Sequence, residues 1–271
     1  MKPARQRLDL IIVARGLAPS RERARALIMS GGVRVNGQVL DKPGASVAGD
    51  SRIETKALDL VYASRGGLKL AGALRHFALD VAGWACLDAG ASTGGFTDCL
   101  LQNGAARVYA VDVGYGQLAW ELRQNPRVVV LERTNARYVM ALDEPVDLVV
   151  SDVSFISVRL IYGAAVRWLR VGGEVVSLIK PQFEAGRGQV GKGGVVRDPT
   201  VHRQVLEGVV ATLGELGLGL RGLMVSPLQG PAGNTEFLGW WQLGVPGDAA
   251  APWVERALAE AAARGAQHGS G

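Results

Sequence analysis

Cysteine and aromatic residues are scarce in this chain of 271 residues, which has two cysteines and 6% Phe, Trp and Tyr. Cys86 lies within an apolar run and Cys99 lies beside one, so we expect both to be reduced core residues. A disulfide is not favoured, and two cysteines alone cannot form a structural zinc site. The small disulfide-rich and zinc-stabilised classes of domain are therefore excluded, and we expect no metal.

Long hydrophobic runs are also missing. The first eight residues are polar and basic, and the apolar stretch after them is short. No segment approaches the roughly 20 apolar residues that a membrane span requires. We therefore expect a cytoplasmic protein that makes no contact with a membrane.

The excess of positive over negative charge lies within the first 60 residues of the chain. Residues 1–60 contain 11 of the 30 Lys and Arg residues but only 6 of the 25 Asp and Glu residues, which accounts for the whole net charge of +5. This distribution predicts a small basic module joined to a larger neutral domain. Phosphate is the expected partner of such a module, although a merely soluble basic surface is an equal alternative on charge alone.

The basic segment has the pattern of two short helices. Residues 5–15 predict a first helix, and residues 21–30 predict a second one with Ser20 as its N-cap. Arg21 and Arg25 are four residues apart, so they share one face of the second helix.

A small sheet is expected to follow these helices. Residues 33–35 predict a strand, Asn36-Gly37 a tight turn, residues 38–40 the returning strand and residues 51–55 a last short strand. This order of elements resembles the α-L RNA-binding module of certain ribosomal proteins, pseudouridine synthases and tyrosyl-tRNA synthetases. The residues that carry the resemblance are Arg7-Leu8-Asp9, Ser20-Arg21, Ala24, Leu27-Ile28 and residues 32–37.

The resemblance implies that the arginine-bearing helix grips structured RNA through its phosphates. An unrelated helical cap is the alternative. We accordingly expect Arg7, Arg21, Arg25 and Arg34 to contact RNA.

Beyond residue 64, apolar strands alternate with helices. This alternation predicts an α/β fold with a doubly wound, mostly parallel, seven-stranded Rossmann-like sheet. The predicted strands cover residues 84–88, 107–111, 128–131, 146–151, 174–179, 220–226 and 236–243. Helices are predicted between them, among others at 117–123 and 158–169, and Gly172-Gly173 predicts a turn into the strand at 174–179. We expect four regions: a small α+β domain at 1–60, a linker at 61–64, the large domain at 65–245, and a helix with a frayed tail at 246–271.

A glycine-rich turn follows the first of these strands, from Asp88 to Phe96. Gly90 permits a sharp turn, and Gly94-Gly95 permit the backbone to approach a ligand closely. The glycine spacing G-x-x-x-G-G departs from the dinucleotide fingerprint. The acid that precedes these glycines would also repel a pyrophosphate. An acid at this position suits the ammonium of a methionine group. A purely structural strand-to-helix turn is the alternative.

Two further polar residues end the neighbouring strands. Asp112 follows Asp88 by 24 residues and can accept hydrogen bonds from ribose hydroxyls, and Asn135 is placed to meet an adenine. Taken alone, Asp112 has a helix N-cap as its alternative explanation, and Asn135 is almost as well explained as a turn residue. The joint pattern predicts a site for S-adenosylmethionine (SAM) formed by Asp88, Gly90, Ser92, Thr93, Gly94, Gly95, Phe96, Asp112 and Asn135.

Four ionisable residues lie at strand ends or in glycine and proline contexts, where active sites of this architecture lie. They are Lys69, Asp152, Lys180 and Glu236. A ribose hydroxyl must lose its proton as it attacks a methyl group, and a lysine accepts that proton only if burial or a nearby cation favours its neutral form. We expect Lys69 to supply that charge beside Lys180, and the two carboxylates to orient the lysines. Ordinary surface salt bridges are the alternative.

Long motifs then identify a family. The chain resembles the TlyA-type ribosomal RNA 2′-O-methyltransferases, historically labelled hemolysins, over nearly its whole length. The motifs are SRGGLKL at 64–70, CLDAGASTGGFTDCLL at 86–101, VDVGYGQLAW at 111–120, ERTNAR at 132–137, SDVSFIS at 151–157, KPQFEAGRGQVGKGGVV at 180–196 and SPLQGPAGNTEF at 226–237.

The resemblance implies an FtsJ-like methyltransferase domain, SAM as cofactor, and cytidines of small- and large-subunit ribosomal RNA as targets. The catalytic Lys-Asp-Lys-Glu set of the family falls on Lys69, Asp152, Lys180 and Glu236.

The loop at 184–196 is rich in glycine and carries basic residues. We hypothesise that Arg187 and Lys192 close over the RNA backbone, with Arg65 at the entrance of the domain as a further RNA contact. A disordered surface loop is the alternative.

Three other functions compete with this prediction. A membrane-active cytolysin would need an apolar or amphipathic segment able to leave the fold, and only ordinary core helices are predicted. A non-catalytic RNA-binding or assembly factor is disfavoured by the intact set of four ionisable residues. A base or protein methylase is disfavoured because the chain has Ser-Asp-Val-Ser-Phe at 151–155 instead of Asn-Pro-Pro-aromatic.

Overall fold

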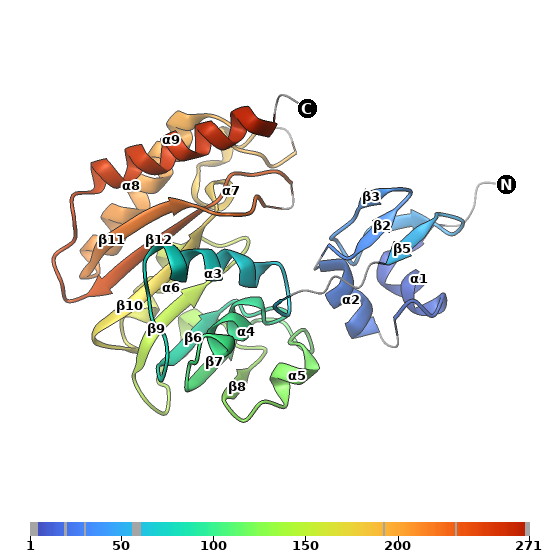
Figure 1. Cartoon of the computed structure of the whole chain (residues 1–271), viewed down its shortest axis with the longest axis horizontal. Coiled ribbons are helices and arrows are strands. Elements are labelled where there is room, and N and C mark those ends of the chain that lie inside the picture. The colour runs from blue at the N-terminus through green and yellow to red at the C-terminus, as the bar shows by residue number, and fades with distance from the viewer. Residues whose placement is uncertain are drawn as a thin grey trace.

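The computed structural model describes residues 5–18, 21–29, 31–55, 61–191, 193–230 and 232–268. Figure 1 shows a small N-terminal domain beside a larger α/β domain, with the C-terminal helix packed on the larger one. The predicted N-cap Ser20 and the predicted RNA contact Lys192 lie outside the described residues, as do residues 56–60.

The small domain packs two helices against short strands. These elements are α1 (Leu8–Ala14), α2 (Arg21–Met29), β1 (Arg5–Arg7), β2 (Val33–Val35), β3 (Gln38–Val39), β4 (Ser46–Ala48) and β5 (Ile53–Thr55). The apolar faces of the helices and β2 form one core, with Leu8, Ile12 and Ile28 fully buried. Asn36 and Gly37 adopt positive φ angles of 51° and 84°, which is the geometry of a tight hairpin turn, as the sequence predicts.

The first predicted helix is wrong in its initial three residues. Residues 5–7 form β1, which pairs antiparallel with β4. The helix therefore begins only at Leu8. Strand β4 has no counterpart among the predicted elements, so residues 5–7 had no visible partner in the sequence. Tertiary pairing therefore decides a local conformation that helical propensity leaves open.

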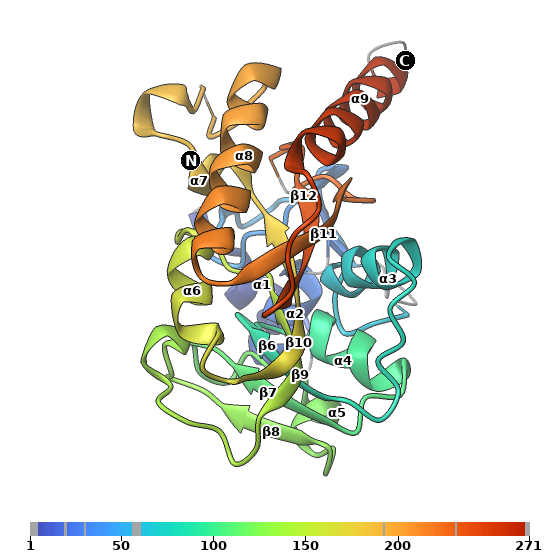
Figure 2. The ribbon, with the colours of Figure 1, turned by 90° about the vertical axis from the view of Figure 1, so that its left-hand side faces the viewer.

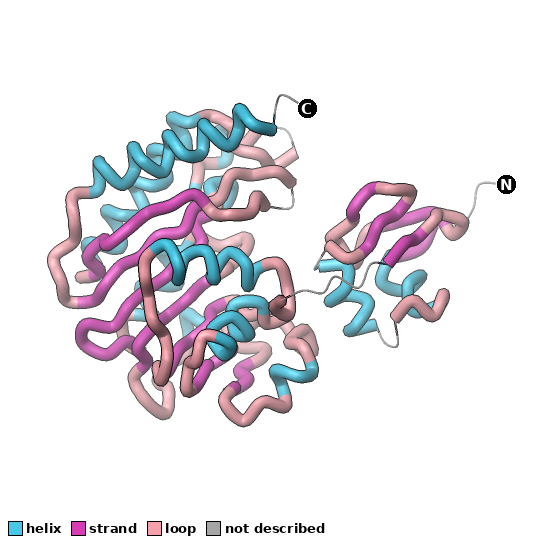
Figure 3. The backbone as a smooth tube through the Cα atoms, in the orientation of Figure 1, coloured by secondary structure: helices cyan, strands magenta, loops and turns pink. Residues whose placement is uncertain are grey.

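The large domain contains the predicted seven-stranded, mostly parallel sheet. Its strands are β6 (Ala85–Ala89), β7 (Arg107–Val111), β8 (Val128–Leu131), β9 (Val146–Ser151), β10 (Leu169–Ile179), β11 (Leu218–Val225) and β12 (Phe237–Leu243). They lie in the order β11-β12-β10-β9-β6-β7-β8, and only the pairings made by β12 are antiparallel. Figure 3 shows these strands as one twisted layer, separate from the small sheet of the N-terminal domain.

Helices cover both faces of the sheet, as Figure 2 shows from the side. One face is covered by α3 (Gly66–His76), α4 (Gly95–Gln102) and α5 (Trp120–Arg123), whose apolar residues form one core cluster. The other face is covered by α6 (Val158–Ala165), α8 (Pro199–Glu215) and α9 (Ala250–His268), whose apolar residues form a second cluster. No helix in the described part of the chain is long and apolar enough to span a membrane.

Two predicted helix boundaries differ from the structure. The helix predicted at 158–169 ends at Ala165, because Leu169 already pairs with Val146 as the start of β10. The register of β10 then shifts before Glu174, where the Gly172-Gly173 turn was expected. The helix predicted from residue 117 begins only at Trp120.

The parallel strands bring distant loops together. Strands β6, β9 and β10 run in the same direction, so the residues that follow each of them lie along one edge of the sheet. Short helices follow there: η1 (Ala136–Tyr138), α7 (Pro181–Glu184) and η2 (Arg187–Gln189). The glycine-rich turn and the predicted catalytic residues Asp152 and Lys180 lie at this edge.

Candidate active site

A cavity of about 500 Å³ opens at this edge of the sheet. Its walls come from the turn after β6, the segments after β9 and β10, the residues before β12 and the start of α3. Met29, Asp41 and Lys42 of the N-terminal domain also line it. The cavity therefore joins elements that are separated by most of the length of the chain.

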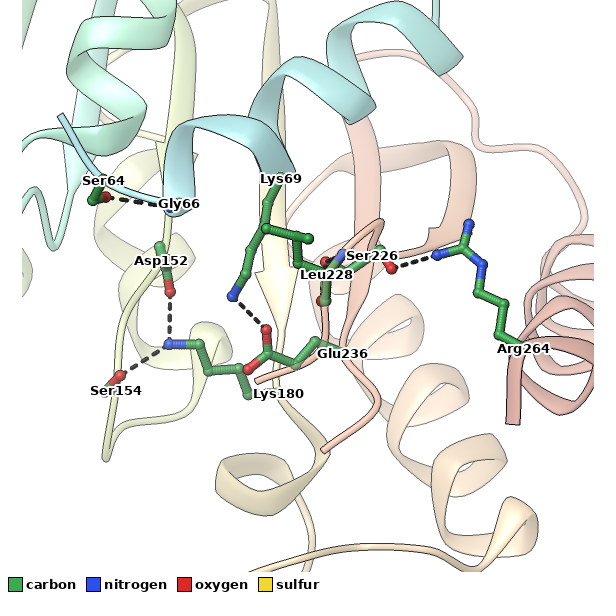
Figure 4. A network of polar contacts seen from close by, with 10 residues as sticks. All are labelled: Ser64, Gly66, Lys69, Asp152, Ser154, Lys180, Ser226, Leu228, Glu236 and Arg264. Carbon is green, nitrogen blue, oxygen red and sulfur yellow. Dashed lines mark hydrogen bonds and ion pairs between the residues drawn. The ribbon is translucent and has the colours of Figure 1, made fainter. Parts of the chain in front are cut away.

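The four predicted catalytic residues meet in this cavity as two ion pairs, shown in Figure 4. Nζ of Lys69, on α3, lies 2.6 Å from Oε2 of Glu236, which precedes β12. Nζ of Lys180, which ends β10, lies 2.6 Å from Oδ1 of Asp152 and donates to Oγ of Ser154 at 2.9 Å. Both pairs are more buried than ordinary surface salt bridges.

The burial of the four residues is uneven. The side chain of Glu236 is 1% exposed and those of Lys69 and Lys180 are 10% and 11% exposed, whereas Asp152 retains 24%. Burial alone would raise the pKa of Asp152, but the positive charges of Lys180 and Lys69 outweigh it and hold the pKa below its usual value. Asp152 therefore stays ionised and keeps Nζ of Lys180 in place.

Asp88 is a buried carboxylate with one oxygen left over. Its Oδ2 accepts hydrogen bonds from the backbone N–H of Thr97 at 2.9 Å and from its hydroxyl at 2.7 Å, but Oδ1 has no partner. Burial, with the negative charges of Asp152 and Asp112, raises the pKa of Asp88 to about 7 in spite of the hydrogen bonds from Thr97. Asp88 lines the cavity, so a cationic ligand group would supply the missing donor.

The glycine-rich turn forms the adjoining wall of the cavity. Gly90, Ser92, Thr93, Gly95 and Phe96 all line it. A side chain at Gly90 would press on the backbone of Asp152 and on Val153, and one at Gly95 would overlap Ser64. These glycines thus allow three loops to approach one another around the cavity.

Gly94 does not line the cavity. It has a positive φ of 96°, and a side chain there would overlap Leu122 of α5. The absence of a side chain at Gly94 lets α5 pack against the start of α4.

Asp112 and Asn135 also lie outside the cavity lining. The carboxylate of Asp112 accepts from the backbone N–H groups of Ser92 at 2.8 Å and Gly114 at 2.6 Å, so it shapes the glycine-rich turn. Oδ1 of Asn135 accepts from the backbone N–H of Arg137 and caps η1. Their binding of ribose and adenine stays a prediction.

Two of the predicted RNA-binding arginines of the small domain bind a buried acid. Arg7 and Arg21 both bind the carboxylate of Asp9, at 2.9 and 3.0 Å, and each remains 49% exposed. The Arg7 guanidinium, aided by Arg21, holds the pKa of Asp9 below its usual value in spite of burial. Asp9 therefore fixes two arginine heads at the surface without covering them.

The other predicted RNA contacts are spread over both domains. Arg34 is exposed and donates to the carbonyl of Gly37, and Arg25 is half-buried on α2. Arg65 is exposed, lines the cavity and lies beside Gly31 of the small domain. Arg187 lies in η2, and its side chain is not among the described parts of the structure.

Several lining residues carry no signal that sequence analysis used. Ser154 binds Lys180, and Phe155 is 91% exposed with a positive φ of 64°, which is rare for a bulky residue. The ring of Phe155 lies 5.0 Å from that of Phe183. All three residues fall within the SDVSFIS and KPQFEAG motifs, so the motifs mark their region but not their individual roles.

The C-terminal helix supports the segment that carries Glu236. Arg264 of α9 donates to the carbonyl oxygen of Ser226 at 2.7 Å, and the backbone N–H of Ser226 donates to the carbonyl oxygen of Glu236 at 2.8 Å (Figure 4). Sequence analysis assigned α9 no role. The structure connects it to a predicted catalytic residue through two hydrogen bonds.

The donor set suits a cationic organic cofactor. Within the described residues, no three His, Cys, Asp or Glu side chains gather as ligands for a metal ion. The orphaned oxygen of Asp88 next to close-packed glycine backbone fits the ammonium and carboxylate of a methionine group. The residues present therefore fit SAM.

Comparison with known proteins agrees with both domains. Residues 62–243 match the model of the FtsJ-like methyltransferase family, and residues 6–53 match that of the S4 domain. The chain is 51% identical over 244 residues to the 16S/23S rRNA (cytidine-2′-O)-methyltransferase TlyA of Mycobacterium tuberculosis, covering 87% of this chain and 89% of that protein.

Two further similar proteins carry another name. Hemolysin A of Brachyspira hyodysenteriae is 41% identical over 235 residues, covering 86% of this chain and 98% of that protein. A solved structure of a candidate hemolysin from Streptococcus thermophilus is 42% identical, covers 100% of both chains and has a TM-score of 0.77. Sequence and structure thus agree over both domains, and this chain belongs to the TlyA family of S4-domain, FtsJ-like methyltransferases.

Proposed function

We propose that this protein transfers the methyl group of SAM to the 2′-hydroxyl of a cytidine in ribosomal RNA. The observation that carries the proposal is the convergence of two Lys–carboxylate pairs and the unpartnered Oδ1 of Asp88 on one cavity. TlyA of M. tuberculosis, which is 51% identical, is named for this reaction. The proposed reaction takes place in the cytoplasm and needs no metal.

The glycine-rich turn and Asp88 hold the cofactor in this proposal. Oδ1 of Asp88 accepts a hydrogen bond from the ammonium, and the close-packed backbone around Gly90 and Gly95 receives the rest of the methionine group. When bound, SAM supplies a methyl group activated by a positively charged sulfur. Asp112, which binds the backbone of the glycine-rich turn, and Asn135 would orient the nucleoside part.

The second ion pair prepares the nucleophile. Nζ of Lys180, in its free-amine form, would accept the proton of the 2′-hydroxyl, and Asp152 and Ser154 would keep Nζ in line. The methyl group would pass to the hydroxyl oxygen as its bond to sulfur breaks, which would leave a neutral thioether. Lys69, held by Glu236, places a second amine at the same cavity.

The surface around the cavity suits an RNA strand. Phe155 and Phe183 offer an exposed aromatic surface next to Lys180, on which an unstacked base can rest. Arg65 and Lys42 at the cavity, and Arg7, Arg21 and Arg34 on the small domain, provide cations for phosphates.

Methyl transfer from labelled SAM to small and large ribosomal subunits that lack the modification tests the proposal. We expect label in RNA, and resistance to alkaline hydrolysis at one ribose, because a 2′-O-methyl group removes the internal nucleophile. No transfer to either subunit, with SAM and RNA binding intact, would favour a non-catalytic RNA-binding factor instead.

A further inference from the structure

The two segments that carry Asp152 and Lys180 are joined a second time, away from the cavity, by Glu184. Oε1 of Glu184 accepts from the backbone N–H of Val158 at 2.8 Å, and Oε2 accepts from the hydroxyl of Ser157 at 2.7 Å. The side chain is 1% exposed and does not line the cavity. A fully buried carboxylate is thus used to hold one loop to another.

The carboxylate of Glu184 lies at the N-terminus of α6 and near an arginine. Ser157 is the N-cap of α6, so the carboxylate lies where unpaired backbone N–H groups and the helix dipole favour a negative charge. Nε of Arg159 lies 3.7 Å from Oε2, and its guanidinium occupies space that the missing side chain of Gly208 on α8 leaves free. Two hydrogen bonds and a nearby cation offset the cost of burying the charge.

Three contacts therefore fasten residues 152–158 to residues 180–184. Lys180 binds Asp152 and Ser154 at the cavity, Phe155 and Phe183 lie ring against ring in the middle, and Glu184 binds Ser157 and Val158 at the far end. The contacts of Lys180 lie at the cavity, where a substrate would arrive. The contacts of Glu184 lie outside the cavity lining, and its side chain is 1% exposed.

We infer that Glu184 is a positioning residue: it fixes the two loops so that Nζ of Lys180, Asp152 and Ser154 meet in the geometry that proton transfer requires. This inference rests on the proposed function of Lys180. A displacement of about 1 Å at reacting groups costs roughly 100-fold in rate. Loss of the anchor should therefore slow the chemical step more than it weakens the binding of SAM at Asp88 and the glycine-rich turn.

The test compares Glu184→Ala with Glu174→Ala in the full-length protein. Glu174 is the control because it is a partly buried glutamate of β10, six residues before Lys180, that accepts a hydrogen bond from Nε1 of Trp240 at 3.0 Å. The measurements are the single-turnover rate of methyl transfer to unmodified subunits, the Kd for SAM and the Tm. We expect the rate to fall about 30- to 100-fold for Glu184→Ala and less than threefold for Glu174→Ala, with both Kd values within twofold of wild type.

A second comparison separates positioning from general damage. If Glu184 acts through Lys180, the same substitution in a Lys180→Ala background lowers the remaining rate by less than threefold. Glu184→Gln, which keeps the shape and one acceptor oxygen, should restore most of the rate. If Glu184→Ala does not fold, Ser157→Ala removes one of the two bonds and should lower the rate by a smaller factor with the same dependence on Lys180.

Equal losses of the single-turnover rate in Glu184→Ala and Glu174→Ala would overturn the inference. So would a Glu184→Ala substitution that lowers the rate as much in the Lys180→Ala background as in the wild-type protein. A Lys180→Ala protein with the wild-type rate would overturn the role of Lys180 itself. That result is visible from this variant alone, so the two failures are distinguishable.

Discussion

At the scale of single residues, the site depends on charges that the fold buries with incomplete compensation. Asp88 is the clearest case, since its Oδ1 has no partner and burial raises its pKa to about 7. Asp9 is the opposite case, because two arginines satisfy it and its pKa is lowered. A buried acid with spare hydrogen-bonding capacity marks a ligand site, whereas a satisfied one marks structure.

The raised pKa of Asp88 predicts that SAM binding weakens as the pH falls below 7. Below pH 7, Asp88 of the free protein is mostly protonated, whereas the ammonium of SAM binds the ionised carboxylate. Binding must therefore release a proton. Between pH 7 and 5.5 we expect the Kd to rise by up to about tenfold per pH unit, with proton release on binding. Calorimetry in buffers of different ionisation enthalpy measures both quantities.

Asp88→Asn is the control for this titration. It should bind SAM more weakly at pH 7 and lose the pH dependence, because its side chain cannot ionise. A wild-type Kd that stays constant from pH 5.5 to 7 would contradict the assignment of Asp88 to the ammonium.

At the scale of elements, packing decides features that local patterns leave open. Helix α3 is absent from the predicted elements because it begins with Gly66-Gly67, and a glycine pair predicts a turn. In the structure, Tyr62 packs so closely on Gly67 that no side chain fits there. Strand β1 was predicted as helix for want of its partner β4. The seven strands of the sheet were predictable because each is a continuous apolar run between helices.

Two glycines with positive φ should respond differently to substitution by alanine. Gly94 has a φ of 96° and its added methyl would overlap Leu122, whereas Gly83 has a φ of 77° and open space around it. We expect Gly94→Ala to lower the free energy of unfolding by about 3 kcal/mol, from overpacking and backbone strain, and Gly83→Ala by about 1 kcal/mol. Denaturant unfolding of both variants checks this, and equal losses would show that the contact with α5 is unimportant.

Gly163 offers the reverse case within α6. It is exposed, its φ is not positive and an added methyl group would meet no atom within 4 Å. Alanine favours a helix interior over glycine by about 1 kcal/mol, so Gly163→Ala should raise the free energy of unfolding by about that amount. A lower Tm for this variant would mean that α6 is held in a conformation other than a regular helix.

At the scale of the whole molecule, two domains contribute to one cavity. Met29, Asp41 and Lys42 of the small domain line it together with the Lys–carboxylate pairs, and Arg65 lies beside Gly31 where the domains approach. The charge distribution of the sequence predicted a basic module but could not place it, because no local pattern encodes how one domain packs on another. The four ionisable residues were predictable because each belongs to a long motif or a strand end, whereas Glu184, Ser154 and Arg264 act through contacts that only the fold creates.

The salt dependence of RNA binding tests this arrangement. Each phosphate contact that is lost should reduce the slope of log affinity against log salt by about 1, so Arg34→Ala and Arg65→Ala should each lower it by that amount. Arg203→Ala is the control, since Arg203 pairs with Glu255 of α9. Filter binding to unmodified subunits at several salt concentrations measures the slopes, and an unchanged slope for both variants would place the RNA elsewhere.

The most direct test of the account is the single-turnover rate of methyl transfer by Lys180→Ala, measured with the Kd for SAM. Removing the proposed base should lower the rate by about 10²- to 10⁴-fold, because the hydroxyl then loses its proton without help. The Kd should stay within twofold of wild type, since Asp88 and the glycine-rich turn are untouched. A rate within tenfold of wild type, with RNA still methylated at the same ribose, would contradict the role of Lys180 in the chemistry.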